Sequence, residues 1–183
     1  MKTLIIQTSH FHTASTFLIN ALYGLIPELR NTRIVGYWDK NICEQFFDDI
    51  IILKCHSTDI DQLILECQNE YNLYFICSER KQLDLTFNDK YKLYTNVVVF
   101  DFDELNESST NTLPNIIQHV HNKINNMLNI KLNVEGGISR IMDMNKRYEE
   151  IKHLPFNYID DFYEIHGSHR NRKSQTIVVN NNV

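Results

Sequence analysis

Four short apolar runs lie within the first 102 residues of this chain and limit the folds that it can adopt. The runs are TLIIQ (3–7), IIILK (50–54), LYFIC (73–77) and VVVFDF (97–102). Each is apolar almost throughout, as is typical of strands buried on both faces of a parallel sheet. Strands that alternate with helical patterns form α/β folds. The sequence therefore predicts an α/β fold with a small central parallel β-sheet flanked by helices.

Helical patterns fill most of the remaining chain. They cover 15–26, 58–69 and 79–89, and the second opens with the cap residues Ser57, Thr58 and Asp59. From Thr112 the pattern is helical over 112–128 and again over 138–154, and NVEGG (133–137) separates the two stretches. We expect one domain over 1–176 and a frayed tail over 177–183.

Charge and hydropathy narrow the class of partner. The 183 residues carry a formal net charge of −5, which argues against a non-specific nucleic-acid binder, although HRNRK (169–173) is a local basic cluster suited to an anion. No apolar run approaches the roughly 20 residues that span a bilayer, and the N-terminal stretch is a poor signal peptide. We expect a soluble, cytoplasmic protein with no membrane or nucleic-acid partner; the sequence does not indicate its oligomeric state.

The four cysteines indicate a structural role and no metal-binding role. Cys43, Cys55, Cys67 and Cys77 show none of the close paired spacings that zinc sites use. We therefore expect reduced, buried thiols and no metal site.

The turn that follows the first predicted strand is rich in hydroxyls and poor in glycine. It reads FHTASTFL (11–18) and leads into the first predicted helix. A helix N-terminus presents unpaired N–H groups to an anion, and Thr13, Ser15 and Thr16 add hydroxyl donors. The stretch suits a phosphate-binding loop but lacks the Gly-Lys-Ser/Thr of a Walker A loop. Simple capping of the helix by Thr13 or Ser15 is the alternative.

A second polar group closes the second predicted strand. KCH (54–56) places Lys54 and His56 two residues apart, so their side chains face the same way. Ligands of open α/β sheets bind at the carboxyl edge. There a Lys neutralises phosphate or sulfate, and a neutral His takes a proton from an attacking hydroxyl. A histidine that is merely hydrogen-bonded at the start of a loop is the alternative.

Together these segments resemble the sulfotransferases that use 3′-phosphoadenosine 5′-phosphosulfate (PAPS). FHTASTFL is similar to that family's Pro-Lys-Ser-Gly-Thr-Thr-Trp-Leu loop, and KCH matches its Lys-x-His. YFICSERKQLDLTF (74–87) resembles its 3′-phosphate segment, FDEL (102–105) its Tyr-Glu-Asp-Leu, and IHGSHRNRK (165–173) its closing Gly-Asn-x-x-Arg-like loop. The five matches occur in the family's order.

The resemblance implies a fold and a set of roles. It implies a strand-loop-helix phosphate-binding motif and sulfuryl transfer from PAPS to an acceptor hydroxyl, with 3′-phosphoadenosine 5′-phosphate as product and no metal. His56 would be the base, and Lys54 and His12, which replaces the family's loop lysine, would act on the transferring group. The implied donor-binding residues are Phe11, His12, Thr13, Ala14, Ser15, Thr16, Phe17, Ser78, Arg80, Thr86, Gly167, Ser168, His169 and Arg170.

Some positions depart from the family pattern and leave alternatives open. Ser78 stands where the family has its 3′-phosphate arginine, so Arg80, Lys81, Arg170 or Arg172 would supply that charge. The substitution at His12 supports a catalytically silent nucleotide-binding relative as an alternative. A P-loop nucleotide kinase, with Asp101 or Asp103 holding magnesium, is another. The acceptor is a small molecule, glycan or peptide hydroxyl that the sequence does not specify.

Overall fold

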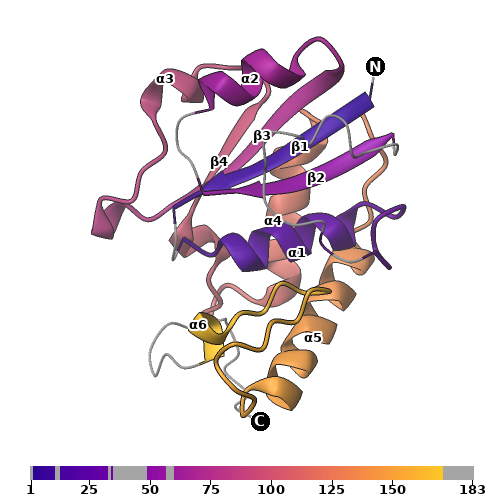
Figure 1. Ribbon diagram of the computed structural model, residues 1–183, viewed down its shortest axis with the longest axis vertical. Helices are drawn as coiled ribbons and strands as arrows, with labels where there is room; N and C mark the ends of the chain where they lie inside the picture. The colour runs from indigo at the N-terminus through magenta and orange to yellow at the C-terminus, as the bar shows by residue number, and fades with distance from the viewer. Residues whose placement is uncertain (1, 11–12, 33, 35–48, 57–59, 171–183) are drawn as a thin grey trace. The chain divides into compact units, whose positions relative to one another are not determined.

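The computed structural model describes residues 2–10, 13–32, 34, 49–56 and 60–170 (Figure 1). The chain falls into two compact units. The first comprises Met1–Ser15 and Val35–Asp103, and the second comprises Thr16–Ile34 and Glu104–Val183.

The first unit is built on a four-stranded, all-parallel sheet. Its strands are β1 (Lys2–Ser9), β2 (Ile50–Cys55), β3 (Tyr71–Glu79) and β4 (Val97–Asp101), in the order β2-β1-β3-β4. The first three apolar runs lie within β1, β2 and β3, and the fourth lies in β4 except for Phe102, which follows that strand. The prediction of an α/β fold with a small parallel sheet is therefore confirmed.

The strand order makes β1 one of the two interior strands of the sheet, with β2 and β3 as its neighbours. Gln7 of β1 stands opposite Lys54 of β2 and Ile76 of β3, and Ser9 stands opposite Ser78. The chain first places β2 on one side of β1 and then crosses to place β3 on the other. The order of the strands thus reverses between β1 and β3, and this is the position at which open α/β sheets bind ligands.

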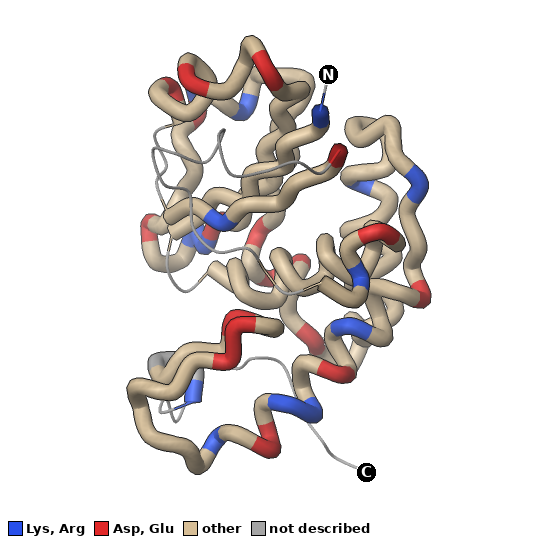
Figure 2. The backbone as a smooth tube through the Cα atoms, turned by 45° about the vertical axis from the view of Figure 1, so that its right-hand side comes forward, with Lys and Arg blue, Asp and Glu red and all other residues tan. Residues whose placement is uncertain are grey.

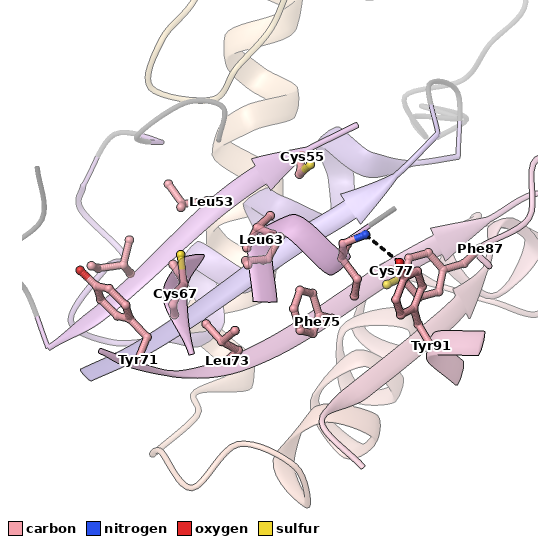
Figure 3. Packing of buried hydrophobic residues seen from close by; sticks show 14 residues of the cluster. Leu53, Cys55, Leu63, Cys67, Tyr71, Leu73, Phe75, Cys77, Phe87 and Tyr91 are labelled. Atoms are coloured by element: carbon pink, nitrogen blue, oxygen red, sulfur yellow. Dashed lines mark hydrogen bonds between the residues drawn. The ribbon is translucent and has the colours of Figure 1, made fainter. Parts of the chain in front are cut away.

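One face of the sheet is covered by two short helices of the same unit. Helices α2 (Asp61–Cys67) and α3 (Asp89–Lys92) contribute Leu63, Cys67 and Tyr91 to a core formed with alternate strand residues (Figure 3). The Tyr91 hydroxyl accepts from the Ile60 N–H at 3.2 Å and donates to Asp61 at 2.9 Å. These two bonds tie α3 to the start of α2.

The cysteines of the described chain are part of this core. Cys55, Cys67 and Cys77 are buried and form no disulfide, as predicted, while Cys43 lies outside the described residues. Burial raises the pKa of the Cys77 thiol, and the negative charge of Glu79 raises it further. These groups pack as small hydrophobic residues.

The predicted helix over 79–89 is wrong. Strand β3 continues to Glu79, a single 3₁₀ turn, η2, spans Lys81–Leu83, and α3 begins only at Asp89. Arg80 and Leu85 exchange two backbone hydrogen bonds of 2.8 and 3.2 Å, and Asp84 adopts a left-handed conformation with φ 53°. The chain between Arg80 and Leu85 therefore forms a closed turn, which a continuous helix excludes.

The second unit is mainly helical. It contains nearly all of α1 (Ser15–Leu25), together with α4 (Leu113–Asn125), α5 (Val134–Ile151) and the short α6 (Gly167–Arg170). The short 3₁₀ helix η3 (Phe102–Leu105) crosses from the first unit into the second. Helices α4 and α5 correspond to the helical patterns predicted from Thr112 onward. In the described part of the chain, basic and acidic residues are interspersed in both units (Figure 2).

Helix α5 begins four residues before the predicted 138, so reading NVEGG as a separator is wrong. Asn133 caps the helix by accepting from the Gly136 N–H at 3.2 Å. The glycines are inside the helix because α1 crosses it there: a Cβ on Gly24 would lie 2.7 Å from the Gly136 carbonyl oxygen and 2.8 Å from the Gly137 Cα. Close contact between the two backbones explains the choice of glycine.

Arg140 of α5 links several segments of the second unit. Its side chain is 2% exposed, and it donates to the backbone oxygens of Arg30 at 2.7 Å, Thr32 at 3.0 Å and Phe162 at 2.7 Å. The guanidinium carbon also lies 4.3 Å from the centre of the Phe162 ring. Burial lowers the pKa of Arg140 from its ordinary value.

Among the described residues, no helix combines the length and apolar character needed to cross a membrane.

Replacing Gly24 by Ala should destabilise the chain by about 1–3 kcal/mol, the usual range for overpacking. The added methyl group meets backbone atoms of α5, which cannot move aside as a flexible side chain can. This cost should exceed the gain of about 1 kcal/mol that alanine brings to a helix. Urea denaturation measures the change. Lys146→Ala, on the exposed side of α5, is the control, and equal stability of the two variants would contradict the crossing.

Candidate functional site

The turn after β1 is fastened to the end of β3. The Thr13 hydroxyl donates to the His10 carbonyl oxygen at 2.8 Å and lies 3.0 Å from the Ser78 hydroxyl. A hydroxyl has one proton, and Thr13 gives its proton to the carbonyl, so Ser78 is the donor in the second bond. A directed chain thus runs from Ser78 through Thr13 to His10. This chain of hydrogen bonds lies at the position where the strand order reverses.

This arrangement gives the predicted phosphate donors a structural role. Thr13 and Ser78 are 0% and 1% exposed, and both hydroxyl protons are used within the turn. Ser15 and Thr16, which open α1, are also buried, as is Phe17. Phe11 and His12 lie outside the described residues. A phosphate at this turn would therefore meet backbone N–H groups unless the hydroxyls exchange their present partners.

Ala14 carries backbone strain. Its φ is 65°, in the left-handed region that favours glycine. Ala14 stands directly before the first residue of α1, and the sequence supplies this conformation without glycine. Strain of this kind is often found in ligand-binding turns.

His56 follows β2 and is oriented by β1. Its Nδ1 lies 3.0 Å from the Ser9 carbonyl oxygen. A carbonyl oxygen only accepts, so Nδ1 carries the proton and the basic nitrogen of the neutral ring is Nε2. The ring is half-buried, whereas Lys54 on the same strand is 2% exposed. The structure therefore brings the predicted base to the end of β1.

Arg80 is the cation at the end of β3 whose charge is least engaged. Its guanidinium carbon lies 4.2 Å from the centre of the Phe102 ring, and it forms no ion pair with any described residue. Lys81, by contrast, lies 3.3 Å from Glu79 and 3.5 Å from Asp101. Of these two predicted anion-binding residues, Arg80 suits the role better. Thr86 is exposed beyond the Arg80–Leu85 turn.

Glu79 is a buried carboxylate that the sequence did not reveal as important. It accepts from the Lys92 ammonium at 2.8 Å and from the Phe87 N–H at 3.4 Å. Burial by itself would raise the pKa of Glu79, but its interactions with Lys92, Lys81 and Phe87 outweigh that effect and hold the pKa below its ordinary value. Glu79 thus fixes the segment that follows β3.

The predicted closing loop belongs to the second unit. Gly167 and Arg170 bound α6, the side chains of Ser168 and His169 are not described, and Arg172 lies outside the described residues. The Arg170 guanidinium is buried and donates to the backbone carbonyls of Ile151, Leu154, Pro155, Phe156 and Tyr158. In this structure the charge of Arg170 therefore binds backbone oxygens at the end of α5 and beyond.

Gln7 is a buried polar residue of β1 that sequence reasoning did not single out. It is 0% exposed within β1, and its side-chain Nε2 lies 2.5 Å from the Ser9 hydroxyl. The available signal was a polar residue at the end of the apolar run TLIIQ.

Comparison of the chain with protein-family models, curated proteins and solved structures gives no match. The functional proposal for this chain therefore depends on its own residues and geometry.

Ala14→Gly should stabilise the chain by about 1 kcal/mol, because glycine adopts the left-handed conformation without the cost borne by alanine. Thermal or urea denaturation measures the effect. Ala21→Gly makes the same change within α1, where it should destabilise the chain. A loss of stability in Ala14→Gly would mean that the turn does not store strain.

Glu79 should make the fold sensitive to acid. Its pKa in the folded state is depressed, so its stabilising contribution is present above the unfolded pKa of about 4.3 and is lost as pH falls through the folded value. Glu79→Gln should be less stable at neutral pH and should lose less stability between pH 5 and pH 3. Urea midpoints across pH test this, with exposed Glu70→Gln as control. An unchanged acid slope would refute the assignment.

Proposed function

We propose that this chain is a sulfotransferase that moves a sulfuryl group from PAPS to a hydroxyl at the carboxyl edge of its sheet. The observation that carries the proposal is the orientation of His56 by the Ser9 carbonyl at the end of β1. The same strand leads into the turn that Ser78 and Thr13 fasten to β3. A base and a turn of the kind that binds anions thus adjoin one strand end.

The residues around this strand end suit the phosphosulfate and the 3′-phosphate of the donor. Backbone N–H groups of the turn at 13–15 would face its oxygens. Arg80, whose guanidinium has an aromatic partner and no described carboxylate partner, would bind a phosphate through its forked donors. Lys54 would add a positive charge from β2. PAPS itself would supply a sulfuryl group that is already activated by its bond to phosphate.

The proposed chemistry is an in-line displacement at sulfur. His56 Nε2 takes the proton of the acceptor hydroxyl as the hydroxyl oxygen forms its bond to sulfur. The bond between sulfur and the bridging phosphate oxygen breaks, and its electron pair leaves with 3′-phosphoadenosine 5′-phosphate. The turn and the basic residues stabilise charge on the sulfuryl and phosphate oxygens as the bond breaks.

A catalytically silent nucleotide-binding relative is the second candidate. The internal use of the Thr13 and Ser78 hydroxyl protons favours it, because Thr13 would otherwise donate to the phosphosulfate and Ser78 to the 3′-phosphate. A P-loop kinase would differ from both candidates by requiring magnesium and preferring ATP.

Calorimetric titration without magnesium should show binding of 3′-phosphoadenosine 5′-phosphate and weaker or no binding of ATP. His56→Ala should retain this binding and lose about 100-fold or more of sulfuryl transfer from labelled PAPS, as expected when a general base is removed. His153→Ala, an exposed histidine beyond α5, is the matched control.

The outcomes separate the candidates. Binding of the bisphosphate with no transfer to a panel of hydroxyl acceptors would identify the silent relative. Magnesium-dependent binding of ATP alone would favour the kinase. Full transfer activity in His56→Ala would remove the proposed base.

A further inference from the structure

Gln7 places a polar side chain inside the most buried part of the first unit. It lies in the interior strand β1, opposite Lys54 and Ile76 on the neighbouring strands, and it is 0% exposed. Side chains at directly opposed positions of a sheet share a face. Gln7 and Lys54 therefore lie at adjacent positions on one face of the sheet.

The Gln7 amide is only half satisfied. Nε2 bonds the Ser9 hydroxyl at 2.5 Å, and Oε1 has no hydrogen-bond partner among the described residues. A buried polar atom without a partner costs free energy, and most such atoms in proteins are paired. Because the amide reaches Ser9, the last residue of β1, its head lies toward the carboxyl end of the strand.

The contact with Ser9 indicates which amide atom needs a partner. A separation of 2.5 Å is shorter than the roughly 2.7–3.2 Å of N–H···O bonds and lies within the range of O–H···O bonds. The oxygen and nitrogen of an amide exchange places on a 180° flip. With the Ser9 hydroxyl donating to the amide oxygen, the unpaired group is the NH₂, which requires an acceptor.

We propose that Gln7 is a ligand-binding residue whose amide NH₂ donates to an anionic oxygen of a phosphate or sulfate group. The assignment of that group to PAPS rests on the proposed function. The register partner Lys54 adds positive charge on the same face of the sheet, which suits an anion and not a second cation. Gln7 thus gives the proposed donor site a buried contact beneath the turn after β1.

Two substitutions at Gln7 test the proposal in the full chain. Gln7→Leu removes the unpaired group at similar size and should leave the chain equally or more stable, yet weaken anion binding by about tenfold or more. Gln7→Glu offers only acceptors and should bind the anion even more weakly. Calorimetry with 3′-phosphoadenosine 5′-phosphate and, separately, inorganic pyrophosphate measures affinity, and urea denaturation measures stability. Gln62→Leu, exposed on α2, should leave binding unchanged.

Any other result would contradict either the proposal for Gln7 or the proposed sulfotransferase function. A destabilised Gln7→Leu would show that the amide is satisfied inside the fold, and unchanged affinity in Gln7→Leu would show that it meets no ligand. Unweakened binding in Gln7→Glu would mean that the ligand brings a donor. Pyrophosphate binding that depends on Gln7, without bisphosphate binding, would uphold the anion contact and refute the sulfotransferase. A wild-type chain that binds neither probe would overturn both.

Discussion

The parallel pairing of β1 with both β2 and β3 is the constraint on which the candidate site depends. Parallel strands end at the same edge, so Ser9, His56 and Ser78 come together although they are far apart in sequence. Because the strand order reverses beside β1, the turn after this strand and the segment after β3 leave the sheet at the position where open α/β sheets bind ligands. The Thr13–Ser78 bond then joins the two segments.

The sequence predicted those features whose causes are local. Strands of a parallel sheet covered by helices are mostly apolar, so the runs from TLIIQ to VVVFDF indicated all four strands. The prediction of a helix over 79–89 was wrong because tertiary contacts determine the structure of this segment. Glu79 accepts hydrogen bonds from the Lys92 ammonium and from the Phe87 N–H. Gly136 led to the prediction of a loop, but it lies where α5 crosses α1 at Gly24, and this contact is also tertiary. Propensity does not report contacts between distant segments.

The sequence indicated several residues of the candidate site but not the contacts that these residues make. The spacing of Lys54 and His56 indicated which edge they share, but not that the Ser9 carbonyl sets the imidazole tautomer. The hydroxyls of the turn were expected to face a ligand, but the Thr13 hydroxyl donates a hydrogen bond to the His10 carbonyl oxygen. A sequence gives the donors that are present and leaves open which acceptors they reach. The strained Ala14 and the half-satisfied Gln7 amide are visible only in three dimensions.

The same distinction applies to charge. Arg170 stands in a basic segment that suits an anion, yet its guanidinium binds backbone oxygens, as Arg140 does elsewhere in the second unit. A buried guanidinium needs several acceptors, and the carbonyls beyond a helix end supply them. Lys81 is likewise engaged with carboxylates. Arg80, which stacks on Phe102 and forms no ion pair with any described residue, therefore remains the cation at the end of β3 that best suits a phosphate of the proposed donor.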